Sequence, residues 1–136
     1  MIKLLASKIT SILAQRDPTF NGKIELNQNI KIKKIEKFAL EGSKKDSLKV
    51  NYIYDIDYKK LGKISIEGIL YLDVEQKIMK EIIKDWKENK KNEERQLEII
   101  NIIIQKASIK AIELEDQLGL PIHFRLPFLK RKKEND

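Results

Sequence analysis

The sequence predicts an α+β protein: an antiparallel sheet of three to four strands, covered on one face by helices, with a long C-terminal helix. Two segments, 48–58 and 63–72, alternate apolar and polar residues with the period of a β-strand. A short break ending in Gly62 separates them, which is typical of an antiparallel hairpin. Apolar residues then recur every three or four positions from 93 to 118, the spacing of an amphipathic helix.

The chain has 136 residues, which suits one domain with one core. We expect residues 1–129 to form that domain and residues 130–136 to be a disordered basic tail. The absence of cysteine excludes disulfides, thiolate zinc sites and cysteine nucleophiles. Polar residues interrupt the N-terminal apolar run, and no apolar stretch reaches the ~18 residues of a membrane span. We therefore expect a cytoplasmic protein without a membrane span.

The N-terminal segment predicts a short helix over residues 2–14. Its apolar side chains fall on one helical stripe, and Asp17 and Pro18 would end the helix. The stripe consists of Ile2, Leu5, Ile9, Ile12 and Leu13.

The segment from Ile24 to Phe38 follows a period of two that slips once. Ile30 and Ile32 continue the alternation, and the pair Lys33 and Lys34 breaks its phase. The slip predicts either a β-bulge or two short strands.

Two helices are expected after the hairpin. Asp73 is a suitable N-cap, and Gln76 lies three residues later, as in a capping box. The first helix carries Met79, Ile82 and Trp86 on one face. A polar break at 87–92 separates it from the long helix.

The long helix carries two apolar stripes, which indicates burial from two sides. Gly119 is the expected residue after its last turn, and Pro121 prevents continuation. One stripe would pack on the sheet and the other on a second chain, although the pattern does not decide which does which. The first stripe consists of Leu97, Ile100, Ile104, Ala107, Ala111, Leu114 and Leu118. The second, which we assign to the oligomer interface, consists of Ile99, Ile102, Ile103, Ile109 and Ile112.

Three tyrosines, Tyr52, Tyr54 and Tyr58, share the apolar face of one predicted strand. They either fill the core or line a groove that holds extended apolar polypeptide, together with Phe124 and Phe128. The tail is either a solubilising end or a phosphate-binding arm, and its cationic residues are Lys130, Arg131, Lys132 and Lys133.

We expect no catalysis and no cofactor. His123 is the single histidine, and its apolar neighbours predict that it points outward from an extended segment. Asp55, Asp57 and Glu67 fall on the polar face of the hairpin among lysines, which favours a charge-balanced surface over an acid–base site. No Gly-rich phosphate loop or nucleophile elbow occurs.

The order of these features resembles the SecB-like superfamily of export chaperones and their relatives, which include uncharacterised archaeal members. Residues 64–72 look like the last sheet strand of that family, and residues 111–127 look like the end of its long helix and the proline-containing segment that follows. The resemblance implies a sheet of four strands, a long helix that builds an oligomer, and binding of unfolded polypeptide.

The chain departs from that family in charge and in its N-terminal helix. Bacterial SecB is acidic, whereas this chain carries a net charge of +7. That charge leaves open an RNA- or ribosome-associated protein, or a non-catalytic subunit of a larger complex. The predicted order also resembles the double-stranded-RNA-binding domain, but the basic signature of that domain is missing.

Overall fold

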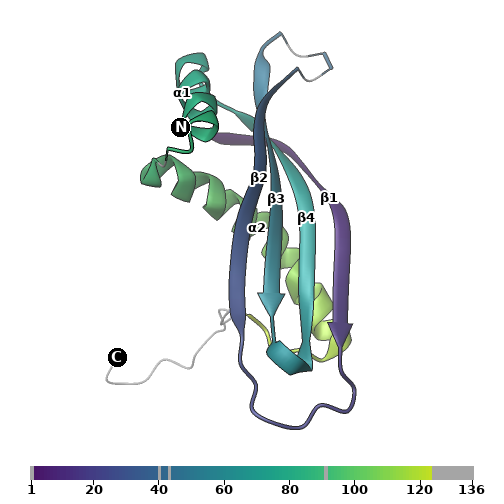
Figure 1. Cartoon of the computed structure of the whole chain (residues 1–136). Helices are drawn as coiled ribbons and strands as arrows, with labels where there is room; N and C mark the ends of the chain where they lie inside the picture. The colour runs from purple at the N-terminus through teal and green to yellow at the C-terminus, as the bar shows by residue number, and fades with distance from the viewer. Residues whose placement is uncertain (1, 40, 43, 91, 124–136) are drawn as a thin grey trace, which may run out of the picture.

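The computed structural model describes residues 2–39, 41–42, 44–90 and 92–123, which form four strands and two helices (Figure 1). A single 3-10 turn, Lys59–Leu61, joins the third strand to the fourth within the described chain. The elements are β1 (Lys3–Arg16), β2 (Asn27–Ala39), β3 (Asp46–Asp57), β4 (Gly62–Asp73), α1 (Gln76–Lys87) and α2 (Glu93–Leu118).

The strands form one antiparallel sheet in the order β1-β4-β3-β2. The predicted hairpin of β3 and β4 is therefore its centre, and β1 and β2 are its edges. Figure 1 shows both helices on one side of the sheet, with α2 running diagonally across it. Helix α2 contacts β1, β4 and β3, and α1 contacts β2.

Alternation along the two central strands places their apolar side chains under the helices, as the sequence predicts. Tyr54 pairs with Ile66 across the strands, and both are completely buried. The opposite face carries polar and charged residues such as Asp55 and Glu67. A sheet with one covered face explains the period of two, to which Ile53 and Ile69 on the open face are exceptions.

The predicted N-terminal helix is wrong, because residues 3–16 form edge strand β1. The register with β4 shifts at Leu5 and again at Thr10, which marks two bulges. Each bulge turns one step of two into a step of three, so the side chains on the helix side of the strand lose the period of two that would identify a strand. Those side chains belong to Leu4, Ser7, Ile9, Ile12 and Ala14.

The phase slip in the second segment is one β-bulge in a continuous strand. The register of β2 against β3 shifts between Ile32 and Lys34, so Ile32 and Ile35 both face the helices. The predicted cap at Asp73 is wrong: Asp73 is the last residue of β4, and α1 begins at Gln76 without a side-chain cap.

Helix α2 spans the residues that the sequence predicts. The Asn92 side chain accepts a hydrogen bond from the Arg95 amide at its start, and Gly119 adopts the left-handed conformation, with φ of 65°, at its end. The division into two stripes is wrong, because the buried line takes members from both. That line consists of Ile99, Ile103, Ala107, Ser108, Ala111 and Glu115.

Candidate functional site

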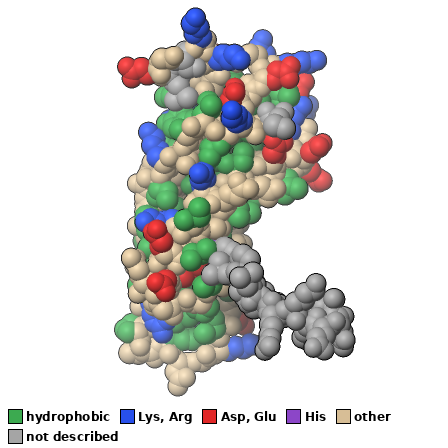
Figure 2. Space-filling model, turned by 180° about the vertical axis from the view of Figure 1, so that it is seen from behind, with side chains coloured by type: hydrophobic (Ala, Val, Ile, Leu, Met, Phe, Trp, Pro, Cys, Tyr) green, Lys and Arg blue, Asp and Glu red, His purple; other side chains and the backbone are tan. Residues whose placement is uncertain are grey.

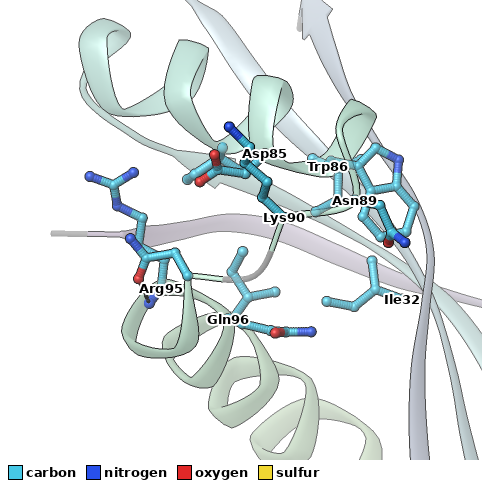
Figure 3. A pocket seen from close by; sticks show the side chains of 11 residues that line it. Ile32, Asp85, Trp86, Asn89, Lys90, Arg95 and Gln96 are labelled. Carbon is cyan, nitrogen blue, oxygen red and sulfur yellow. Dashed lines mark hydrogen bonds between the residues drawn. The ribbon is translucent and has the colours of Figure 1, made fainter.

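A surface pocket of about 120 Å³ lies where α1, the start of α2 and strand β2 meet (Figure 3). Its apolar wall comes from all three elements, and its rim carries amide and charged groups. The wall consists of Ile32, Ile35, Ile82, Trp86 and Ile99. The rim consists of Asp85, Asn89, Lys90, Asn92, Arg95 and Gln96.

The loop between the helices shapes the mouth of the pocket. Asn89 has a positive φ of 57°, which turns the chain out of α1, and the Lys90 amide donates to the Asp85 carbonyl at 2.8 Å. The Arg95 guanidinium lies 2.6 Å from the Glu81 carboxylate and joins the two helices. These contacts hold the rim residues in fixed positions around the opening.

The size of the pocket suits one apolar side chain. Sites that enclose a whole small-molecule ligand usually measure about 300–1,000 Å³. Trp86 of the apolar wall has 36% of its surface exposed, so its ring offers apolar area to an incoming group. The sequence gives no direct signal for this pocket, because its residues come from three separate segments and Trp86 fits the core pattern of α1.

A second feature is a buried polar cluster between β3, α2 and the segment that follows α2. The Tyr58 hydroxyl donates to the Glu115 carboxylate and lies 2.9 Å from the Pro121 carbonyl. His123 Nδ1 lies 2.7 Å from Glu115 Oε1, and His123 Nε2 lies 3.1 Å from Ser108 Oγ. The cluster therefore fastens residues 121–123 to the body of the domain.

Two tyrosines of this network, Tyr54 and Tyr58, have a raised pKa, so their neutral form is favoured. Burial raises the pKa of the Tyr58 hydroxyl, and the hydrogen bond to Glu115 raises it further. Burial also raises the pKa of Tyr54, whose hydroxyl donates to Gln28 Oε1 at 2.8 Å. Gln28 Nε2 in turn donates to the His123 carbonyl at 3.0 Å, which extends the network to β2.

The prediction that His123 points outward is wrong: its side chain is 1% exposed. The described part of the segment after α2 is not a strand, so the alternation of its side chains does not apply. His123 contacts Ser108 through one ring nitrogen and Glu115 through the other. The same three residue types, in the same order of contact, form the nucleophile, base and acid of a catalytic triad. Ser108 is buried on α2, and its hydroxyl lies 3.5 Å from the Tyr54 hydroxyl.

The tyrosines predicted to bind polypeptide are not accessible. Tyr52, Tyr54 and Tyr58 are exposed by at most 1%, so the prediction that they line a groove is wrong and the alternative, a tyrosine-filled core, is correct. Burial also raises the pKa of Tyr52. Phe124, Phe128 and the cationic tail of Lys130, Arg131, Lys132 and Lys133 lie outside the described residues.

The five residues assigned to an oligomer interface do not share one environment. Ile99 and Ile103 are buried in the core of this chain, so their assignment to an interface is wrong. Ile102 and Ile112 are half-buried, and Ile109 is 64% exposed. The prediction failed because α2 crosses the sheet diagonally, so its buried line drifts around the helix.

Edge strand β1 carries the most apolar exposed surface of the sheet. Leu5, Ile9, Ile12 and Leu13 are each between 38% and 46% exposed. Lys8 is the single charged residue between positions 4 and 15. An edge of this kind leaves backbone groups unpaired beside apolar side chains, which favours pairing with another strand.

Comparison of the chain with protein-family models, curated proteins and solved structures returns no match. In the part of the chain that the structure describes, no group of three or more acidic, histidine or cysteine side chains is arranged to hold a metal ion. Neither described helix is long and apolar enough to cross a membrane.

Proposed function

We propose that this protein binds extended polypeptide segments and works as an oligomer, as the resemblance to SecB-like chaperones implies. The observation that carries the proposal is the apolar pocket between α1, α2 and β2. It accepts one large apolar side chain and surrounds it with hydrogen-bonding groups, such as Asn89 and Gln96. A site of this kind recognises a short chain segment through one anchoring residue.

Two further features support the proposal. The sheet has four strands followed by two helices, the number of strands that the resemblance implies. Edge strand β1 is apolar and nearly uncharged, so it provides a surface on which a second copy of the chain can pair.

The pocket can be tested with Trp86, which is the one tryptophan of the chain. We expect an unstructured peptide that contains Leu and Phe to shift the Trp86 emission on titration, because a bound side chain removes water from the ring. Gln96→Phe would fill the pocket from its rim. Burial of a large apolar side chain contributes about 1.5–3 kcal/mol, so we expect this variant to weaken peptide binding by roughly 10- to 100-fold.

Gln105→Phe is the matched control, because Gln105 is exposed on the same helix and does not line the pocket. It should bind the peptide as the unmodified protein does. Equal affinity of the unmodified protein and the Gln96→Phe variant would contradict the assignment of the pocket. In a second assay, the protein should suppress the aggregation of an unfolded client in proportion to its concentration.

A further inference from the structure

One face of α1 carries four exposed lysines in a regular row. Lys77, Lys80, Lys84 and Lys87 are spaced by three, four and three residues, so their side chains are neighbours on the helix surface. We call this row the α1 lysine stripe. The stripe spans eleven residues of helix, so its first and last Cα atoms lie about 15 Å apart at the rise of an α-helix.

None of the four lysines of the stripe forms an ion pair with a carboxylate of the described residues. The acidic residues of α1 lie on its other flank. Glu81 pairs with Arg95 at 2.6 Å, and Asp85 lines the pocket beside α2. Helix α1 therefore separates its charges into a cationic side and an acidic side.

The stripe borders a surface hollow between α1 and β2. Lys80, Lys84 and Lys87 line the hollow together with Lys37 of β2. Its two acidic residues already pair with lysines outside it: Glu36 with Lys34 and Lys49, and Glu88 with Lys90. The lysines of α1 that line the hollow therefore form no ion pair with these two carboxylates. Figure 2 shows Lys and Arg side chains at the end of the molecule that carries α1, with Asp and Glu side chains among them.

An anionic membrane is a poor partner for this surface. A membrane-binding amphipathic helix inserts its apolar face into the bilayer. The apolar face of α1 packs instead against the sheet, where Met79 is 1% exposed and Ile82 is 5% exposed. The exposed part of α1 carries positive charge but has no free apolar face to insert into a bilayer. Such a surface suits a soluble polyanion.

We propose that the α1 lysine stripe binds the phosphate backbone of single-stranded nucleic acid. Such a strand carries a charge at every nucleotide and can follow a row of lysines in any sequence. The net charge of +7 adds long-range attraction for a polyanion. This surface is separate from the proposed polypeptide pocket, so each proposal can fail without the other.

The test uses fluorescence anisotropy of a labelled single-stranded RNA of about 20 nucleotides, long enough to cover one such binding site. We expect the affinity of the full chain to fall steeply with salt. The variant K77Q/K80Q/K84Q/K87Q should bind more weakly, and its salt dependence should be shallower by about 0.7 in logarithmic slope for each phosphate that the variant no longer neutralises. Unchanged circular dichroism would show that the variant is folded.

The matched control is K23Q/K60Q/K63Q/K106Q, which removes four exposed lysines from other surfaces. Both variants lower the net charge from +7 to +3. The control should keep most of the affinity; equal loss in both variants would overturn the assignment to α1. Polyglutamate is the second probe. If it binds the stripe more tightly than RNA of equal charge does, the partner is an acidic polypeptide and the nucleic-acid proposal is overturned.

Discussion

His123 Nδ1 lies 2.7 Å from Glu115 Oε1, and both side chains are almost completely buried. Glu115 belongs to α2, and His123 follows that helix by five residues. The same carboxylate accepts a hydrogen bond from Tyr58, which directly follows β3. One buried acidic residue thus joins the sheet, the long helix and the segment after it.

We expect Glu115→Ala to destabilise the fold strongly. Removal of the Glu115 carboxylate leaves the buried Tyr58 hydroxyl and His123 ring without their polar partner. Breaking a buried pair in this way costs about 3–5 kcal/mol. Urea denaturation followed by circular dichroism would measure the free energy of unfolding. Glu113→Ala is the control, because the ion pair of Glu113 with Lys110 is exposed and should contribute below about 1 kcal/mol. Equal costs of the two substitutions would show that the buried cluster is not stabilising.

The stability of the protein should fall in strongly alkaline solution. The folded-state pKa of Tyr58 lies above the value of about 10 for an exposed tyrosine, so the fold favours the neutral hydroxyl. The stability that the fold gains from the neutral Tyr58 hydroxyl is fully present below pH ~10 and is lost as the pH rises toward the higher folded-state pKa. Tyr58→Phe should therefore show a shallower loss of stability above pH ~10. Urea midpoints over this range decide the point, and identical slopes would refute it.

Gly68 of β4 should not tolerate a larger residue. A Cβ atom at this position would lie 2.4 Å from the Tyr52 hydroxyl oxygen and 2.5 Å from the ring carbon that carries it. We expect Gly68→Ala to cost about 1–3 kcal/mol through overpacking. In a Tyr52→Leu background the same substitution should cost much less, because the ring is gone. A double-mutant cycle measures this coupling, and additive costs would disprove the contact.

Association should depend on edge strand β1. If the proposed oligomer forms through this edge, light scattering will show more than one chain per particle, and Ile9→Lys with Ile12→Lys will give monomers, because charge blocks edge pairing. Asn27→Lys with Asn29→Lys adds the same charge to the other edge strand and should leave the assembly intact. A monomeric unmodified protein at micromolar concentration would count decisively against the oligomer.

Elements with an uninterrupted local pattern could be predicted from the sequence. The β3–β4 hairpin alternates apolar and polar residues over most of its length because one face is covered, and α2 has both a periodic apolar line and Gly119 at its end. The α+β class and the separate helix α1 follow from the same patterns. The predicted cap at Asp73 failed because the sheet pairs Asp73 with Lys3 and retains it as a strand residue.

The sites were less predictable, because they depend on residues far apart in the chain. The pocket combines Ile32, Trp86 and Ile99, and no spacing in the sequence brings these residues together. The α1 lysine stripe, by contrast, has a regular helical spacing that the sequence contains. Whether carboxylates pair with these lysines depends on how β2 and α2 pack beside α1, and only the tertiary structure shows this packing.

By itself, the sequence determined the central hairpin, the length of α2 and the covered face of the sheet, since each has a local apolar period. It left open whether the slip in the second segment is one β-bulge or a break between two strands, and the register of β2 against β3 decided that. The tertiary structure alone decided that residues 3–16 form a strand. Two bulges remove the strict period of two from that segment, and pairing with β4 supplies hydrogen bonds that no local pattern reveals. It also decided the burial of His123, because Glu115 and Ser108 provide the polar partners that make burial favourable.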